Sequence, residues 1–169
     1  IKDVVKFAKS RGVRVIPEFD SPAHVGEGWQ KKNLTTCFDF HPYEDYCWQP
    51  PCGNLDPTKA EVYDVLEDIY REMVENFEPT VFHMGGDEIF ISCWNSSESL
   101  QQWMLEKEWK LETEDFMKLW GHFQTNALER MDKVSRGDMP IILWTSELTE
   151  EPYGLEYLDK ARYIIQMWS

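Results

Sequence analysis

Apolar residues along this chain follow two alternating patterns, one typical of helices and one typical of buried strands. Apolar positions at helical spacing, which predict amphipathic helices, lie in residues 1–10, 62–73 and 116–131. Continuous apolar runs, typical of strands buried on both faces, lie at residues 13–16, 80–84, 141–144 and 163–168. A short helix is also expected near residues 155–161. Strands that alternate with helices predict a parallel sheet covered by helices, and thus the α/β class.

Several residues indicate where these helices begin and end. Gly12 follows the first helix, where glycine takes the left-handed turn at little cost. Asp56 is a capping residue and Pro57 suits the first helical position, so the second helix is expected to begin there. Residues 137–140 break the third helix. One strand is expected after Gly12 and another after residues 137–140.

Two architectures fit this alternation, a (β/α) barrel and a doubly wound open sheet, and the periodicity favours neither. In both, ligands bind beyond the carboxyl ends of the strands, where polar and aromatic residues gather in this chain. No glycine-rich phosphate loop follows any strand, which weakens a nucleotide-binding interpretation. Residues 25–53 have no sustained periodicity, and we expect a long loop that is either functional or cross-linked.

The charge of the chain excludes one class of partner. Acidic residues number 31 against 17 basic ones, for a formal net charge of −14, and such a chain repels phosphate backbones. Nucleic acid is therefore not an expected partner. No apolar run approaches the roughly 18 residues of a membrane-spanning helix. The length of 169 residues suits one domain, residues 1–169.

The cysteines leave several alternatives open. Four cysteines, two of them close together in residues 47–52, could form two disulfides, two reduced pairs or a metal site. Asn33 and Asn95 each begin a tripeptide that fits the N-glycosylation pattern, which has meaning only for a chain made in the secretory pathway. This pattern favours an oxidising compartment, and disulfides follow from that expectation.

Adjacent carboxylates follow the second predicted strand. Asp87 and Glu88 come directly after Gly85 and Gly86, which allow the backbone to leave strand geometry so that both side chains reach one ligand. Two carboxylates in a dry pocket titrate jointly, and one of them holds its proton to higher pH. This arrangement predicts a general acid, whereas the alternative is a solvated turn with ordinary surface acids.

A metal site and a catalytic histidine are the other interpretations of these polar residues. His83, Asp87 and Glu88 could ligate zinc or manganese, but no second histidine-rich segment supplies further ligands, so no metal and no cofactor are expected. His24 follows the first strand close to Glu18 and Asp20, where it is either a satisfied loop histidine or a residue that orients an acid.

Two tryptophans lie at the ends of later strands. Indole faces stack on the apolar faces of sugar rings, so Trp144 and Trp168 at the same sheet edge favour a sugar pocket over simple core packing. Trp103 and Trp120, at helical spacing, are assigned to the core.

Two segments together resemble glycoside hydrolase family 20. Residues 83–88, His-Met-Gly-Gly-Asp-Glu, are similar to the signature of this family, and residues 11–24 are similar to its other hallmark, which ends at the active-site histidine, here His24. The resemblance extends to Trp94, Trp144 and Trp168. It implies part of a (β/α)8 TIM barrel, about strands three to six with their helices.

The resemblance implies an exo-acting hydrolase that releases terminal β-linked N-acetylglucosamine or N-acetylgalactosamine with retention, through an oxazolinium formed by the substrate's own acetamido oxygen. Glu88 is then the general acid and base, and Asp87 accepts the acetamido N–H. His24 supports Glu88, while Trp144 and Trp168 wall the pocket. The partner is a carbohydrate with a terminal N-acetylhexosamine. The alternative is a glycan-recognition protein that binds in the same pocket without cleavage.

Further expectations come from the insect-type enzymes that residues 25–53 resemble. The resemblance pairs Cys47 with Cys52 and Cys37 with Cys93. Some chitin-processing relatives carry an acid where Gln49 stands, beside the leaving-group site, so a preference for chitin oligomers does not follow. The full-length protein is expected in the secretory pathway, as an extracellular, lysosomal or membrane-anchored protein, and a homodimer is one expected assembly.

Overall fold

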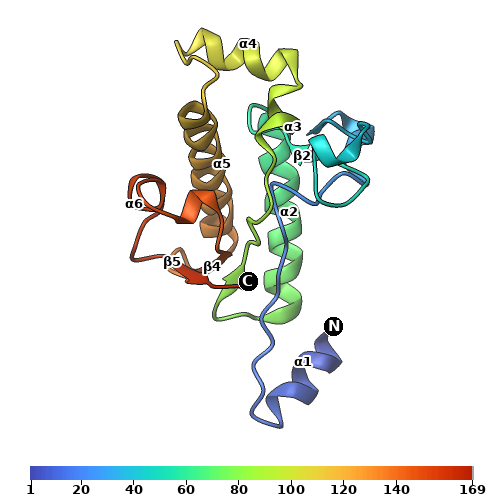
Figure 1. The fold of residues 1–169 in the computed structure, drawn as a ribbon. Helices are drawn as coiled ribbons and strands as arrows, with labels where there is room; N and C mark the ends of the chain where they lie inside the picture. The colour runs from blue at the N-terminus through green and yellow to red at the C-terminus, as the bar shows by residue number, and fades with distance from the viewer. Residues whose placement is uncertain (169) are drawn as a thin grey trace.

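Strands and helices alternate in the computed structural model, which describes residues 1–168 (Figure 1). The helices are α1 Lys2–Lys9, α2 Ala60–Phe77, α3 Ile91–Asn95, α4 Glu98–Glu106, α5 Thr113–Val134 and α6 Tyr153–Tyr157. The strands are β1 Thr35–Thr36, β2 Asn54–Leu55, β3 Phe82–His83, β4 Ile141–Trp144 and β5 Tyr163–Gln166. Three 3₁₀ helices, η1 Gln30–Lys32, η2 Tyr43–Asp45 and η3 Glu147–Thr149, complete the order.

The predicted parallel sheet forms from β3, β4 and β5, with β4 in the middle. Phe82 is paired with Ile141, which is in turn paired with Tyr163. On the other side of β3, Glu18 forms a single parallel bridge to His83. Four segments therefore lie in sheet order as they do in sequence order, which is the arrangement of consecutive β-α-β units.

The first predicted strand, residues 13–16, was wrong. The sheet contact is displaced to Glu18, because the backbone N–H of His83 donates to the carbonyl of Pro17 at 3.0 Å and the N–H of Phe19 donates to the carbonyl of His83 at 3.0 Å. Val13 and Ile16 are instead 57% and 43% exposed. A β-branched run is not sufficient for a strand when the described residues supply it with no partner.

Helices α2 and α5 lie side by side (Figure 1) and pack on the strands. Their apolar stripes and the inward strand residues form one core whose fully buried members include Leu66, Tyr70, Phe82, Phe123, Ile141, Trp94 and Trp120. Trp120 is thus a core residue as predicted, whereas Trp103 is only partly buried against this core. The helical stripes predicted the faces that pack.

Several element boundaries differ from the prediction. Helix α2 begins at Ala60 rather than at Pro57, because a carboxylate oxygen of Asp56 accepts both the backbone N–H and the hydroxyl of Thr58, at 3.0 and 2.6 Å. Asp56 therefore caps a separate turn. Helix α6 lies earlier than residues 155–161, β5 ends at Gln166 rather than 168, and α3 and α4 were not predicted.

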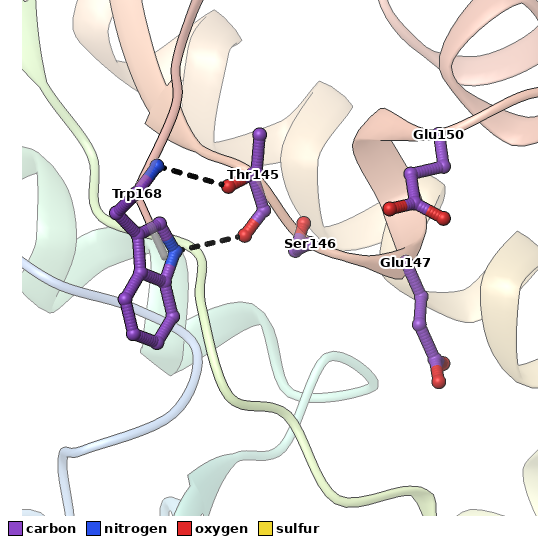
Figure 2. Close-up of a pocket in the computed structure, with 5 residues that line it drawn as sticks. All are labelled: Thr145, Ser146, Glu147, Glu150 and Trp168. Atoms are coloured by element: carbon purple, nitrogen blue, oxygen red, sulfur yellow. Dashed lines mark hydrogen bonds between the residues drawn. The ribbon is translucent and has the colours of Figure 1, made fainter.

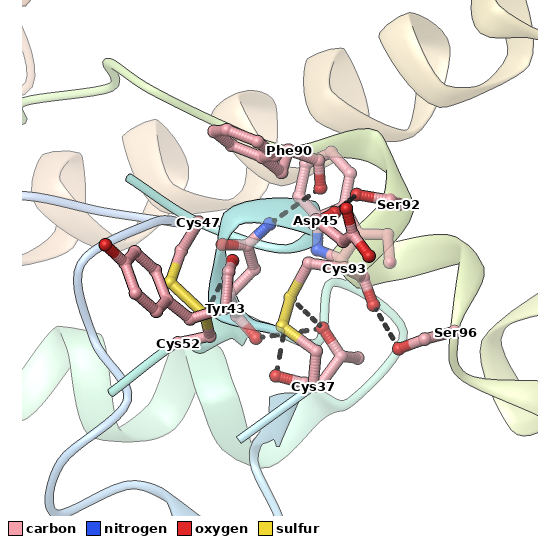
Figure 3. Close-up of a disulfide and its surroundings, with 12 residues drawn as sticks. Cys37, Tyr43, Asp45, Cys47, Cys52, Phe90, Ser92, Cys93 and Ser96 are labelled. Atoms are coloured by element: carbon pink, nitrogen blue, oxygen red, sulfur yellow. Dashed lines mark hydrogen bonds between the residues drawn. A yellow bond between two sulfur atoms is a disulfide. The ribbon is translucent and has the colours of Figure 1, made fainter. Parts of the chain in front are cut away.

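The segment expected as a long loop is cross-linked. Its strand β1 pairs antiparallel with β2, and the disulfides Cys37–Cys93 and Cys47–Cys52 form as the resemblance implied (Figure 3). The Cys37–Cys93 bridge is almost fully buried and joins the loop to helix α3. The loop is thus held covalently to the segment that follows β3.

Beside single exposed apolar side chains elsewhere, two groups of them lie at two places in the structure. One place is α1 and the chain after it, and the other is β5 with the two residues beyond it; the side chains are Ile1, Val4, Phe7, Val13, Ile16, Ile164, Ile165, Met167 and Trp168. No helix within residues 1–168 is long and apolar enough to span a bilayer.

Removal of each disulfide in the full-length protein should destabilise the fold by an amount that depends on the loop it closes. The bridge Cys37–Cys93 spans 56 residues and Cys47–Cys52 spans 5, so chain entropy predicts losses of about 4 and about 2 kcal/mol. Denaturant titration of the paired Cys→Ser variants measures both losses. Equal losses would contradict the loop-entropy explanation.

Candidate active site

A two-glycine turn ends β3 and directs the chain toward the candidate acids. Gly85 and Gly86 have φ angles of +67° and +84°, which glycine adopts without strain. A Cβ on Gly85 would lie 1.8 Å from a carboxylate oxygen of Asp20. The backbone N–H of Gly85 donates to Nδ1 of His83, and that of Gly86 donates to Oδ1 of Asp20, both at 2.9 Å. The backbone thus leaves strand geometry immediately before Asp87, as predicted.

The structure brings together the three predicted catalytic side chains. Nε2 of His24 lies 3.2 Å from Oε2 of Glu88 and 4.0 Å from Oδ2 of Asp87. The side chains of Asp87, Glu88 and His24 are 17%, 21% and 26% exposed. His24 and Glu88 both have left-handed backbone conformations, at φ +58° and +53°, which is a strained geometry that often marks functional sites.

Asp20 is a further member of this cluster that the sequence analysis did not select. The pKa of Asp20 is raised from 3.8 to about 8, chiefly by burial and then by the charge of Asp87, while the hydrogen bond from Gly86 opposes the shift. The raised pKa in this cluster thus belongs to a carboxyl that the prediction of a general acid did not include. The sequence signal that could have identified Asp20 is its position at the end of the first strand segment, close to His24.

The metal-ligand set considered from the sequence was His83, Asp87 and Glu88. The described residues do not bring these three side chains together as a group of possible ligands. Nδ1 of His83 accepts the N–H of Gly85, so the ring proton is on Nε2, and burial lowers the pKa of the imidazole. A different trio, Asp20, His24 and Asp87, places one possible ligand atom of each residue within 4.8 Å of the others.

Trp144 is fixed at the end of β4 by contacts to two other strand segments. Its indole N–H donates to Oε1 of Glu18 at 2.9 Å, and its ring centroid lies 4.5 Å from that of His83. The indole is partly exposed. An indole held at both its edge and its face is a rigid surface on which a sugar ring can stack.

Trp168 borders a separate hollow at the ends of β4 and β5. The cavity has a volume of about 360 Å³ and is lined by Thr145, Ser146, Glu147, Glu150 and Trp168 (Figure 2). The indole N–H of Trp168 donates to the carbonyl of Thr145 at 3.1 Å, and the side chain is 49% exposed. The described residues thus leave one indole face open to a ligand.

Gln49 is exposed within the Cys47–Cys52 loop. This loop contacts the acid-bearing segment, because the ring of Trp48 packs edge-on against Phe90 at 5.6 Å, and Phe90 lies two residues after Glu88. The carbonyl of Phe90 also accepts the side chain of Asn54 at 3.3 Å. The loop is therefore a neighbour of the candidate acids.

The predicted glycosylation acceptors lie on the surface. Asn33 follows η1 and Asn95 ends α3, and both are exposed. The side-chain oxygen of Asn95 accepts a hydrogen bond from Gln101 at 3.1 Å.

The chain that carries this cluster matches a known protein family. The chain matches the catalytic domain of glycosyl hydrolase family 20 over residues 1–169, and it belongs to that family. It is 54% identical to the chitooligosaccharidolytic β-N-acetylglucosaminidase of Bombyx mori and 53% identical to that of Ostrinia furnacalis, over 100% of this chain. Those matches cover 28% and 29% of the two relatives, so the chain spans less than a third of their length.

More distant relatives and solved structures agree with this assignment. The β-hexosaminidase subunit beta of Homo sapiens is 32% identical over 85% of this chain and 24% of its own length. The fold is similar to that of the family 20 exo-β-N-acetylglucosaminidase of Vibrio harveyi in complex with N-acetylglucosamine. That match has a TM-score of 0.74 and 22% identity over 99% of this chain and 24% of the other.

Gly85→Ala in the full-length protein should abolish the geometry of the cluster, because the added Cβ meets Asp20 at 1.8 Å. We expect a loss of hydrolytic activity of at least about 100-fold, the scale on which misplaced catalytic groups act. Gly28→Ala is the matched control, since Gly28 also has positive φ, +89°, but an added Cβ meets nothing within 4 Å. Equal losses of activity in both variants would mean that backbone strain, rather than the contact with Asp20, is responsible.

Proposed function

We propose that this chain carries the catalytic acid of an exo-acting β-N-acetylhexosaminidase. The observation that supports this most directly is the cluster at the end of β3, where Glu88 and Asp87 both lie within 4.0 Å of His24. The substrate is a carbohydrate with a terminal β-linked N-acetylglucosamine or N-acetylgalactosamine. Related enzymes are named for N-acetylglucosamine or N-acetylhexosamine release.

Each member of the cluster has a distinct role in this proposal. Glu88 protonates the leaving oxygen and then activates water, and His24 at 3.2 Å holds its carboxyl in position. Asp87 accepts the acetamido N–H and stabilises the positive charge of the oxazolinium intermediate, because a fixed carboxylate in a partly buried site interacts strongly with that charge. The nucleophile belongs to the substrate, so the protein needs no second carboxylate for attack.

Trp144 and Trp168 are the proposed walls of the sugar pocket. Trp144 is fixed by Glu18 and His83, and Trp168 presents a half-exposed indole beside the neighbouring strand end. Gln49, on the loop that packs against Phe90, is proposed to border the leaving group. A neutral amide there can hydrogen-bond a sugar hydroxyl but supplies no charge, so the proposal extends to N-acetylhexosaminides in general and not to chitin oligomers in particular.

We further propose that the chain supplies about strands three to six of a (β/α)8 barrel. The parallel order of Glu18, β3, β4 and β5 supports this, as do the apolar side chains exposed at α1 and β5, which the remaining strands and helices would cover. An isolated chain is then expected to be inactive. Two disulfides and the exposed acceptors Asn33 and Asn95 support passage through the secretory pathway.

Replacement of the proton donor tests the catalytic role. Glu88→Gln in the full-length protein keeps the shape of the side chain but cannot transfer a proton, so kcat on a chromogenic β-N-acetylglucosaminide should fall by about 10²–10⁴-fold. Glu75→Gln, on an exposed position of α2, is the matched control and should leave kcat unchanged. Turnover by Glu88→Gln at the wild-type rate would refute the proposal.

Substrate assistance predicts a separate result with inhibitors. A thiazoline analogue of the oxazolinium should bind the full-length protein tightly, and Asp87→Asn should weaken that binding by at least about 10-fold, since a hydrogen bond to a charged group contributes about 1.5–3 kcal/mol. Inhibition constants from steady-state assays measure both effects. No inhibition at millimolar concentration would indicate an enzymic nucleophile instead.

A further inference from the structure

We propose that Asp20 is a positioning residue, held as a neutral carboxylic acid that donates a hydrogen bond to the buried Oδ1 of Asp87. In this arrangement the pair carries a single negative charge, which is located on Asp87. The catalytic consequence rests on the proposed function, whereas the protonation state of Asp20 does not.

The backbone fixes one oxygen of Asp20. Its Oδ1 accepts the N–H of Gly86 at 2.9 Å, and it lies so close to the turn that a Cβ on Gly85 would approach to 1.8 Å. An oxygen occupied by a backbone donor stays an acceptor, so the proton of a neutral Asp20 belongs on its other oxygen. The carboxyl therefore has a defined donor side and a defined acceptor side.

Asp87 supplies the acceptor for that proton. Its Oδ1 is buried and has no hydrogen-bond partner among the described residues, and one carboxylate oxygen of Asp87 lies within 4.8 Å of one of Asp20. A hydrogen bond to Asp87 is also among the causes that raise the pKa of Asp20. A buried carboxylate oxygen without a donor has lost its hydrogen bonds to water and gained none in return, which is unfavourable. A proton between the two acids removes this cost, whereas two ionised carboxylates would repel each other.

The surroundings of Asp20 favour its neutral form. The titratable groups near it are Glu18, His24, His83, Asp87 and Glu88. The pKa of Asp20 is raised to about 8, chiefly by burial, then by the charge of Asp87 and to a smaller extent by that of Glu18. Burial also lowers the pKa of His83, so that imidazole supplies no positive charge near neutral pH.

Two consequences for Asp87 follow. The hydrogen bond from Asp20 fixes the orientation of the Asp87 carboxylate, and its other oxygen, Oδ2, remains directed toward His24 at 4.0 Å, where a substrate amide can reach it. Loss of the Asp20 proton above pH 8 would place a second negative charge beside Asp87. That charge would disturb the orientation on which transition-state stabilisation depends.

The test compares the full-length wild type with Asp20→Asn, Asp20→Ala and the exposed control Asp138→Asn. The amide of Asn keeps a donor toward Asp87 and an acceptor for Gly86 at every pH. We expect wild-type kcat/KM to fall through an alkaline limb centred near pH 8. Asp20→Asn should keep activity within about 10-fold of wild type and lose that limb, whereas Asp20→Ala should lose at least about 100-fold at all pH values. Retention of the limb in Asp20→Asn would overturn the proposal.

Thermal unfolding tests the protonation state even if the protein hydrolyses no substrate. With a folded pKa near 8 and an unfolded value near 3.8, the unfolded wild type releases this proton first, so stability is lost as pH rises between these values. The Tm of Asp20→Asn should therefore rise relative to wild type across that window, while Asp138→Asn shows a constant difference. A constant difference for Asp20→Asn would mean that Asp20 is ionised.

A chelator separates this hydrogen bond from a metal bridge among the same side chains. Treatment of the wild-type protein with EDTA should leave both kcat/KM and the Tm difference unchanged. Loss of activity that a divalent cation restores would overturn the proposal, because the ion would then balance the two carboxylates.

Discussion

The close contact between the glycine turn after β3 and the carboxyl of Asp20 is the constraint on which the rest of the site depends. Asp20 and Gly86 are separated by 66 residues, yet a backbone N–H of one segment donates directly to the side chain of the other. The contact places the two hallmark segments of the family against each other. As a consequence, Asp87 and Glu88 lie close to His24. Only glycine at position 85 leaves enough space for the carboxyl of Asp20.

Around this contact the protein uses short polar interactions to fix aromatic and acidic groups. Glu18, next to the same segment, accepts the indole N–H of Trp144, and His83 packs on the face of that indole. The nitrogen of His83 that faces the turn accepts from Gly85. Neighbouring segments of the sheet, at Glu18, β3 and β4, thus hold both the indole of Trp144 and the turn that leads to the candidate acids.

Much of the fold followed from the sequence, because regular elements depend on local pattern. The run at β4 and the stripe along α5 were predicted at nearly their observed positions. The failures have a tertiary cause: residues 13–16 lack a partner strand, and Asp56 caps a turn instead of α2. Asp20 was missed for the same reason, since its neighbours in space are distant in sequence. The proximity of His24 to Glu88 came from family resemblance, which carries three-dimensional information that periodicity does not.

The buried bridge between Cys37 and Cys93 has a consequence for the mobility of the loop at residues 25–53. It attaches residues 25–53 to helix α3, which follows the turn that carries Asp87 and Glu88 (Figure 3). The loop also packs on the acid-bearing segment, because Trp48 contacts Phe90, two residues after Glu88. The disulfide thus limits how far the loop that carries Gln49 can move relative to the candidate acids.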